Sequence, residues 1–254
     1  MSGFFFGPKE KKLFGFYHSP QGDAQAVLIS PPWGVEYQYA HRALRSLAQR
    51  LAEQGCHVFR FDFSGTGDSW GKCQDAGLNQ WMDDLDEAAR ELRSLSGKES
   101  FDLVGLRLGA TMAMKFAGSA GGVGNLVLWD PILDGQAWLQ ELQQVAQEHE
   151  GSVRKEPSDR SLEVGRHPVS PQFLTQIQDI RIEDLDTVEP AKILVLTTEE
   201  GDSLERWTKN MKGPLEREYR QILQPPAWKE DTSIWGGHLP VGALTAIVDW
   251  LGSQ

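Results

Sequence analysis

The stretch FDLVGLRLGATMAM at residues 101–114 joins a short apolar run to a glycine-flanked turn and then to a run of helix-forming residues. Apolar residues before the turn are typical of a buried strand, and the alanine and methionine residues after it favour a helix. Gly105 and Gly109 flank the turn, and glycine allows backbone conformations and close approaches that a side chain would block. The stretch therefore predicts a strand, a tight turn and a helix in direct succession.

Arg107 occupies the middle of this turn, within the sequence GLRLG. The spacing matches the G-x-S-x-G turn that lifts a nucleophilic serine above a sheet, with arginine at the serine position. Arginine stays protonated at physiological pH and cannot act as that nucleophile. A guanidinium at the start of a helix suits a carboxylate or a phosphate, so we expect Arg107 to bind an anion. The alternative is a structural salt bridge with a neighbouring acid such as Asp130.

The composition indicates an acidic protein, and we expect it in the cytoplasm. Lysine and arginine total 25 against 36 aspartate and glutamate residues, which gives a formal net charge of −11. This charge argues against a nucleic-acid partner and against a basic membrane-binding face. The amino-terminal stretch MSGFFFGPKEKK holds three consecutive apolar residues, too few for a signal sequence or an integral membrane segment.

Cys56 and Cys73 are the two cysteines of the chain. A disulfide framework needs more cysteines than these two, and a zinc site needs further ligands beside them. We therefore expect two free thiols, no metal and no cofactor.

Short apolar segments alternate with amphipathic helical segments along most of the chain. In addition to the 101–114 stretch, strands are predicted at residues 12–18, 24–30, 56–63, 125–129, 191–198 and 216–223, and helices at residues 39–54, 78–95, 204–211 and 239–251. Such alternation implies right-handed crossovers and a mainly parallel central sheet with helices on both faces. The predicted fold class is α/β.

This alternation breaks between residues 134 and 189. The segment has a glutamine- and glutamate-rich helix at residues 136–150, a shorter helix near residues 171–178, and no convincing strand. We interpret it as a helical cap inserted over the carboxyl edge of the sheet. The predicted units are a core of residues 1–133 and 190–254 and a cap of residues 134–189.

A catalytic site built on such a turn needs an acid after a late strand and a histidine after the last strand. Asp202 and His238 occupy those places and form a candidate relay pair. The acid would orient the imidazole, and the histidine would move a proton. Asp130, Glu199 and Glu200 remain alternatives to Asp202 as the acid.

Backbone donors for an oxyanion are predicted at two turns. One is the N–H group of Leu108, directly after the arginine, and the other lies at Trp33 and Gly34, after an early strand that a double proline ends. Trp33, Trp129 and Trp235 lie near predicted strand ends, where core packing is the main expectation and an aromatic cleft wall the alternative.

The glycine-bearing loop SGTGDS at residues 64–69 and the polar stretch around Cys73 contain possible substitute nucleophiles. Ser64 could reach a cleft, but serine in such a loop is more often a turn residue. Asp62 and Asp68 are expected to organise the loop through hydrogen bonds from side chain to backbone. Neither Ser64 nor Cys73 is a strong candidate for the missing nucleophile.

The motifs GTGDS at residues 65–69, LRLGA at residues 106–110 and LWDP at residues 128–131 resemble the α/β-hydrolase superfamily. Within it they are similar to the exosortase A system-associated hydrolases, in which an elbow that reads GLRLGA is a recurring feature. The resemblance covers most of the chain, and its specific motifs lie between residues 31 and 142. It implies an α/β-hydrolase fold and a role beside exopolysaccharide production and protein sorting in Gram-negative bacteria.

Two functions from different classes follow from these observations. The first is a hydrolase or acyl transferase with a non-standard elbow, in which His238 activates water and Arg107 clamps an anionic substrate group. The second is a catalytically silent binding protein for an anionic metabolite or a protein partner. The first would act on a small molecule, anionic or bearing an acyl or sugar group, and the sequence is compatible with a homodimer.

Overall fold

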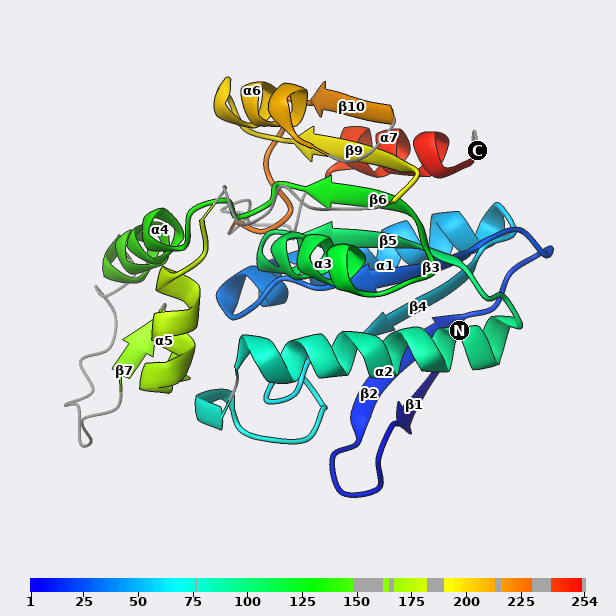
Figure 1. The fold of residues 1–254 in the computed structure, drawn as a ribbon, viewed down its shortest axis with the longest axis horizontal. Helices are drawn as coiled ribbons and strands as arrows, with labels where there is room; N and C mark the ends of the chain where they lie inside the picture. The colour runs from blue at the N-terminus through cyan, green and yellow to red at the C-terminus, as the bar shows by residue number, and fades with distance from the viewer. Residues whose placement is uncertain are drawn as a thin grey trace.

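The computed structural model describes residues 1–75, 77–148, 162–164, 167–181, 190–212, 216–229 and 239–252. Within them an eight-stranded sheet runs through the molecule in the order β1-β2-β4-β3-β5-β6-β9-β10 (Figure 1). The strands are β1 (Ser2–Phe6), β2 (Leu13–His18), β3 (Ala26–Ser30), β4 (His57–Phe61), β5 (Phe101–Leu106), β6 (Val123–Trp129), β9 (Lys192–Thr197) and β10 (Glu216–Gln221). β1 and β2 pair antiparallel and the six others run parallel, which confirms the predicted sheet.

β1 is the edge strand that the sequence analysis missed. The strand predicted at residues 12–18 is β2, which lies second in the sheet because β1 pairs with it from Ser2↔Tyr17 to Phe6↔Leu13. Phe4 and Phe6 of β1 pack against the ring of Phe59, with centroid distances of 5.9 and 5.0 Å. This long-range aromatic packing stabilises β1, whose local sequence alone does not predict a strand.

Helices cover both faces of the sheet. The helices are α1 (Val35–Glu53), α2 (Leu78–Ser96), α3 (Leu108–Ser119), α4 (Gly135–Glu148), α5 (Pro171–Gln178), α6 (Ser203–Asn210) and α7 (Val241–Gly252), with one 3₁₀ turn, η1 (Cys73–Asp75). α1 and α7 bury their apolar residues in one core cluster, whereas α2 and α3 belong to a second cluster on the opposite face. The layers are therefore those expected of a doubly covered α/β sheet.

The amphipathic pattern of α1 shows how local sequence sets these layers. Its buried positions include Ala40, Leu44, Leu47 and Leu51, which recur at helical spacing along one face. Gly55 follows the helix with φ of 94°, a left-handed conformation that favours glycine. The helix therefore ends where predicted and returns the chain to β4.

The segment predicted as a cap contains α4, β7 (Leu162–Val164), β8 (His167–Val169) and α5, which lie together at the carboxyl ends of the parallel strands (Figure 1). The expectation that this segment has no strand is wrong, because β7 and β8 form an antiparallel pair. Trp138 and Phe173 from this segment are buried in the same apolar cluster as α2 and α3. Val164 of β7 and Val169 of β8 belong to this cluster too, so packing on the core supplies the apolar contacts that a three-residue strand cannot make alone.

Among the described residues, no helix combines the length and the apolar character needed to cross a membrane. The same residues include no group of three or more histidine, cysteine, aspartate or glutamate side chains placed to hold a metal ion.

Candidate functional site

The turn between β5 and α3 has the predicted strand–turn–helix form, with Arg107 at its centre. Arg107 has φ of 54° and ψ of −123°, a sparsely populated conformation for a residue with a side chain. A Cβ atom at Gly105 would lie 2.4 Å from Cα of Ala110, and one at Gly109 would lie 2.2 Å from the carbonyl oxygen of Pro31. Both flanking positions therefore require glycine, as the sequence predicted.

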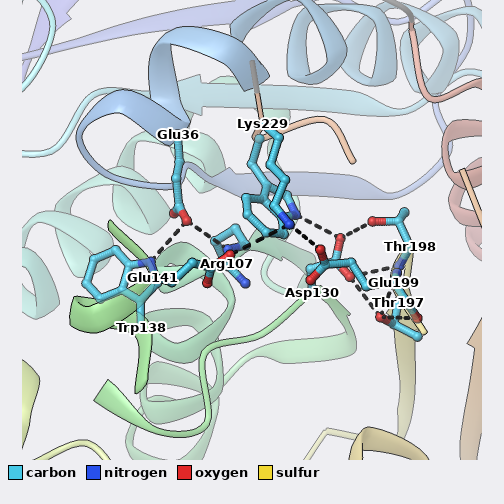
Figure 2. Close-up of polar contacts among 10 residues, drawn as sticks. Glu36, Arg107, Asp130, Trp138, Glu141, Thr197, Thr198, Glu199 and Lys229 are labelled. Carbon is cyan, nitrogen blue, oxygen red and sulfur yellow. Dashed lines mark hydrogen bonds and ion pairs between the residues drawn. The ribbon is translucent and has the colours of Figure 1, made fainter. Parts of the chain in front are cut away.

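The Arg107 guanidinium is buried and binds two carboxylates (Figure 2). Its Nε donates to Oε1 of Glu36 at 2.9 Å, and its Nη2 donates to Oε2 of Glu141 at 2.6 Å. The guanidinium carbon also lies 3.6 Å from the centroid of the Trp228 ring, within the range of a cation–π contact. Burial alone would lower the pKa of Arg107, but the two carboxylates outweigh it and raise this pKa, so the side chain remains a cation.

Glu36 is the deeper of the two partners, with 2% of its side chain exposed. Its Oε1 also accepts a hydrogen bond from Nε1 of Trp138 at 3.0 Å, whereas no described residue donates to Oε2. Burial raises the pKa of Glu36, and Arg107 and Trp138 offset part of this rise. The sequence analysis missed Glu36, although it lies four residues before Ala40 on the buried face of α1, where an acid is unexpected.

Glu141 reaches Arg107 from α4 and is 32% exposed. Nζ of Lys229 lies 3.9 Å from Oε1 of Glu141, forms an ion pair with Glu199, and lies 4.6 Å from the Trp228 ring centroid. These side chains come from α4, from the segment after β9 and from the segment after β10, which are far apart in the sequence. No local pattern could therefore have predicted this cluster.

Asp130 lies at the end of β6, next to the turn, and has φ of 46°. Its Oδ1 accepts from Oγ1 of Thr197 and the backbone N–H of Thr198, and its Oδ2 accepts from Oγ1 of Thr198 and Nε1 of Trp228. The alternative expected for Arg107, a structural salt bridge with an acid, is present, but its partners are Glu36 and Glu141. Asp130, the acid named as an example, is not one of them. Both Asp130 oxygens already accept two hydrogen bonds, which leaves little capacity for a histidine.

The candidate relay pair is only partly described. His238, like Trp235, lies outside the described residues. Asp202 is the exposed residue before α6, and its backbone oxygen accepts from Nε of Arg206 at 3.3 Å. Of the alternative acids, Glu199 is bound by Lys229 and Glu200 is exposed. The assignment of His238 and Asp202 stays a prediction.

The predicted oxyanion donors lie on two backbone segments that touch each other. β3 pairs with β5 up to Ser30↔Gly105, so the turn after each strand lies at the same edge of the sheet. The 2.2 Å clearance between a Cβ at Gly109 and Pro31 shows how closely α3 approaches the segment that leads to Gly34. Gly34 has φ of 66° and directly precedes α1. The use of Leu108, Trp33 and Gly34 as donors stays a prediction.

Of the three tryptophans proposed as an aromatic wall, the two described are core residues. Trp33 and Trp129 are 1% and 0% exposed. Trp33 packs against the rings of Trp138 at 6.1 Å and Phe173 at 5.0 Å. The expected role of these two tryptophans in packing is therefore confirmed.

His167 of β8 is a histidine that the sequence analysis did not consider. Its ring lies 5.4 Å from that of Trp33, and a Cβ at Gly34 would lie 3.3 Å from its Cδ2. Burial lowers the pKa of His167, so its imidazole is neutral near pH 7. β8 thus places a neutral imidazole beside the segment predicted to supply an oxyanion donor.

Ser64 is held as a turn residue. Its Oγ donates to Oδ1 of Asp84 at 3.0 Å, its N–H donates to Oδ2 at 2.7 Å, and its carbonyl accepts from Nε1 of Trp81. Asp62 organises the same loop by accepting from the backbone N–H of Asp68 at 3.1 Å, as predicted. No described histidine is hydrogen-bonded to Ser64, which argues against nucleophilic use of this hydroxyl.

Both cysteines are free, as expected. Burial raises the pKa of Cys73, which keeps it a thiol rather than the thiolate that nucleophilic attack requires. The same cause raises the pKa of Cys56 to about 11.

Comparison with solved structures shows the fold of the whole chain. Est1E from Butyrivibrio proteoclasticus, with ferulic acid bound, has a TM-score of 0.69 and 17% identity over 98% of this chain and 96% of that chain. DcsB in complex with its substrate analogue has a TM-score of 0.72 and 16% identity over 99% of both chains. Proline iminopeptidase from Mycobacterium smegmatis has a TM-score of 0.66 and 12% identity over 99% of this chain and 98% of that chain. At these identities the similarity shows the α/β-hydrolase fold alone.

Sequence comparison shows the family. No curated protein sequence matches the chain. The model of the serine aminopeptidase S33 family matches residues 37–169, which make up more than half of the 254 residues. The matched region contains the Arg107 turn, Asp130 and Glu141. The chain therefore belongs to the serine aminopeptidase S33 family of α/β-hydrolases.

Proposed function

We propose that this chain is a catalytically silent α/β-hydrolase that binds a small molecule through a carboxylate. The observation that carries the proposal is the residue at the elbow: a buried arginine, bound to two carboxylates, lies where a serine hydrolase needs its nucleophile. A permanently charged guanidinium cannot form an acyl intermediate, but it binds carboxylates through charge-assisted hydrogen bonds. In this proposal the elbow keeps recognition of a carboxylate and has lost covalent catalysis.

The surroundings of Arg107 favour a ligand that carries an aromatic or acyl group beside its carboxylate. Trp228 stacks on the guanidinium, and Lys229 adds a second cation near Glu141. The Trp228 ring is buried and holds the two cations in place, and a ligand ring or acyl chain would add apolar contact at the exposed side of the cluster. Ferulate, the acid bound by the structural neighbour Est1E, has this combination and is a suitable first probe.

Two measurements test this proposal. Incubation with a fluorophosphonate probe should leave the protein unlabelled by mass spectrometry, because no serine occupies the elbow. Titration calorimetry should detect binding of ferulate and not of methyl ferulate, which lacks the negative charge. A stoichiometric adduct on any serine would contradict catalytic silence, and equal binding of acid and ester would contradict carboxylate recognition.

A second candidate function is hydrolysis by an unusual route, which membership of the S33 family favours. In this scheme His238, oriented by Asp202, takes a proton from water while the water oxygen attacks an ester or amide carbonyl. The tetrahedral intermediate then breaks its bond to the alcohol or amine, which takes the proton from His238 as it leaves. Turnover of methyl ferulate that His238→Ala abolishes would support this candidate. Esterase activity that appears only in Arg107→Ser would instead show that the other catalytic groups are functional and that the arginine prevents catalysis.

The resemblance to the exosortase A system-associated hydrolases suggests the cellular setting. We propose a cytoplasmic protein that acts beside exopolysaccharide production, and the sequence is compatible with a homodimer. Deletion of the gene should alter the amount or composition of secreted polysaccharide, and light scattering after gel filtration would give the oligomeric state. Unchanged polysaccharide in the deletion strain would contradict this setting.

A further inference from the structure

The carboxylate of Glu141 lies between two cations at the position where a ligand carboxylate would bind. Its Oε2 is 2.6 Å from Nη2 of Arg107, and its Oε1 is 3.9 Å from Nζ of Lys229. Figure 2 shows Glu141 beside the Arg107 guanidinium and below Lys229. The structure thus holds a carboxylate in this subsite, and the carboxylate belongs to the protein itself.

The two acids bound to Arg107 differ in how freely they can leave. Glu36 is 2% exposed and is fixed by a second hydrogen bond from Trp138. Glu141 is 32% exposed and receives no hydrogen bond other than that from Arg107 among the described residues. Water can therefore replace Glu141 as a partner more readily than Glu36, because the Glu141 carboxylate already contacts solvent.

α4 itself can stay in place during such an exchange. Trp138 and Leu142, on the same helix as Glu141, are 2% and 3% exposed and anchor α4 to the core. The glutamate side chain has three rotatable bonds and already contacts solvent, so a change of rotamer can remove its carboxylate from Arg107. Neither the helix nor the cap has to move.

We propose that Glu141 is an internal competitor that occupies the carboxylate subsite until a ligand displaces it. The subsite consists of Nη2 of Arg107 and Nζ of Lys229, and both side chains lie over the ring of the buried Trp228. This inference rests on the proposed carboxylate-binding function and adds the residue that regulates affinity. It also assigns Lys229 as the second cation that recognises the ligand.

The test compares calorimetric titrations of wild type, Glu141→Gln and Glu205→Gln with ferulate at fixed ionic strength. Glu141→Gln removes the competing charge and keeps the size of the side chain, so ferulate should bind about three- to tenfold more tightly than to wild type. Glu205→Gln is the matched control, because Glu205 is 39% exposed and pairs with Lys209 at 2.6 Å outside this cluster. Its affinity for ferulate should equal that of wild type.

Lys229→Met in the Glu141→Gln background tests the second cation. Ferulate affinity should fall about three- to tenfold relative to Glu141→Gln alone, and Lys209→Met in the same background should leave it unchanged. An unchanged affinity in Lys229→Met would remove Lys229 from the subsite.

The outcomes separate this inference from the function on which it rests. Equal ferulate affinity of wild type and Glu141→Gln would overturn the competitor role and leave carboxylate binding intact. No ferulate binding by either protein would overturn both. Tighter binding of methyl ferulate to Glu141→Gln, by the same factor as ferulate, would show that the variant merely opens space and would also overturn the competitor role.

Discussion

Arg107 and Asp130 lie at the ends of the neighbouring strands β5 and β6, and their surroundings differ in an instructive way. Both are charged, both are buried, and they are the non-glycine residues with positive φ among those described. Such strained conformations are concentrated at functional sites in folded proteins. The two residues therefore lie at the edge of the sheet that holds the candidate site.

The difference lies in the groups that stabilise each side chain. Asp130 accepts four hydrogen bonds from uncharged donors, three of them on adjacent residues of the β9 end. Arg107 is neutralised by opposite charges, and one of them, on Glu141, reaches it from α4 and is partly exposed. The Asp130 side of the edge is thus fixed, whereas the Arg107 side has one partner that solvent or a ligand can replace.

The largest expected effect comes from the fixed side. Asp130→Ala would leave four donors without their acceptor, three of them on buried residues next to β9, and should lower the free energy of unfolding by about 4 to 5 kcal/mol. Urea unfolding followed by circular dichroism measures this. Asp134→Ala, which removes only an exposed acceptor for the N–H of Ala137, is the control and should cost about 1 kcal/mol. An equal loss of unfolding free energy in Asp130→Ala and Asp134→Ala would show that the buried hydrogen bonds of Asp130 do not make this side of the edge more stable.

Arg107→Gln should be destabilising by about 3 kcal/mol, because it leaves Glu36 buried without a cation. The double variant Arg107→Gln/Glu36→Gln removes both charges and should recover most of this loss. The same urea unfolding experiment measures both. If the double variant is no more stable than Arg107→Gln alone, the unpaired charge of Glu36 is not the cause of the lost stability.

The pH dependence of Arg107→Gln gives a smaller effect with a definite sign. Burial already raises the pKa of Glu36 in the native protein, and loss of Arg107 removes a charge that opposes this rise. A carboxyl whose pKa is higher in the folded than in the unfolded state binds more protons when folded, so stability increases as the pH falls towards the unfolded pKa. Between pH 8 and pH 5 the variant should therefore regain about 1 to 2 kcal/mol relative to wild type. A flat difference over this range would contradict a buried, titrating Glu36.

Glu141→Gln should have the smallest effect on stability, about 0 to 1 kcal/mol, since its carboxylate is partly exposed and water can solvate it. Thermal unfolding at low and high salt measures this, and high salt should reduce the difference further. A loss as large as that of Arg107→Gln would show that Glu141 is a fixed structural partner and would remove the distinction between the two sides of the edge.

Elements with strong local signals were predictable from the sequence. The strand–turn–helix at residues 101–114 and the helix α5, with Ser170 as its cap and Pro171 at its start, are present where the pattern placed them. β1 and the β7–β8 pair were missed. β7 and β8 have three residues each, and β1 has a single buried residue and is stabilised by packing of Phe4 and Phe6 on Phe59 of β4. Short strands carry too few residues for their periodicity to be distinctive.

The sequence by itself determined the frame of the site: the glycines that permit the turn, the arginine at its centre, and the absence of a nucleophile there. These features follow from the conformational range of glycine and the fixed charge of arginine, which act over a few residues. Only the tertiary structure decided what Arg107 binds, because Glu36 and Glu141 lie 71 and 34 positions away in the sequence. Ion pairs depend on distance and burial in space, and sheet pairing and helix packing set both.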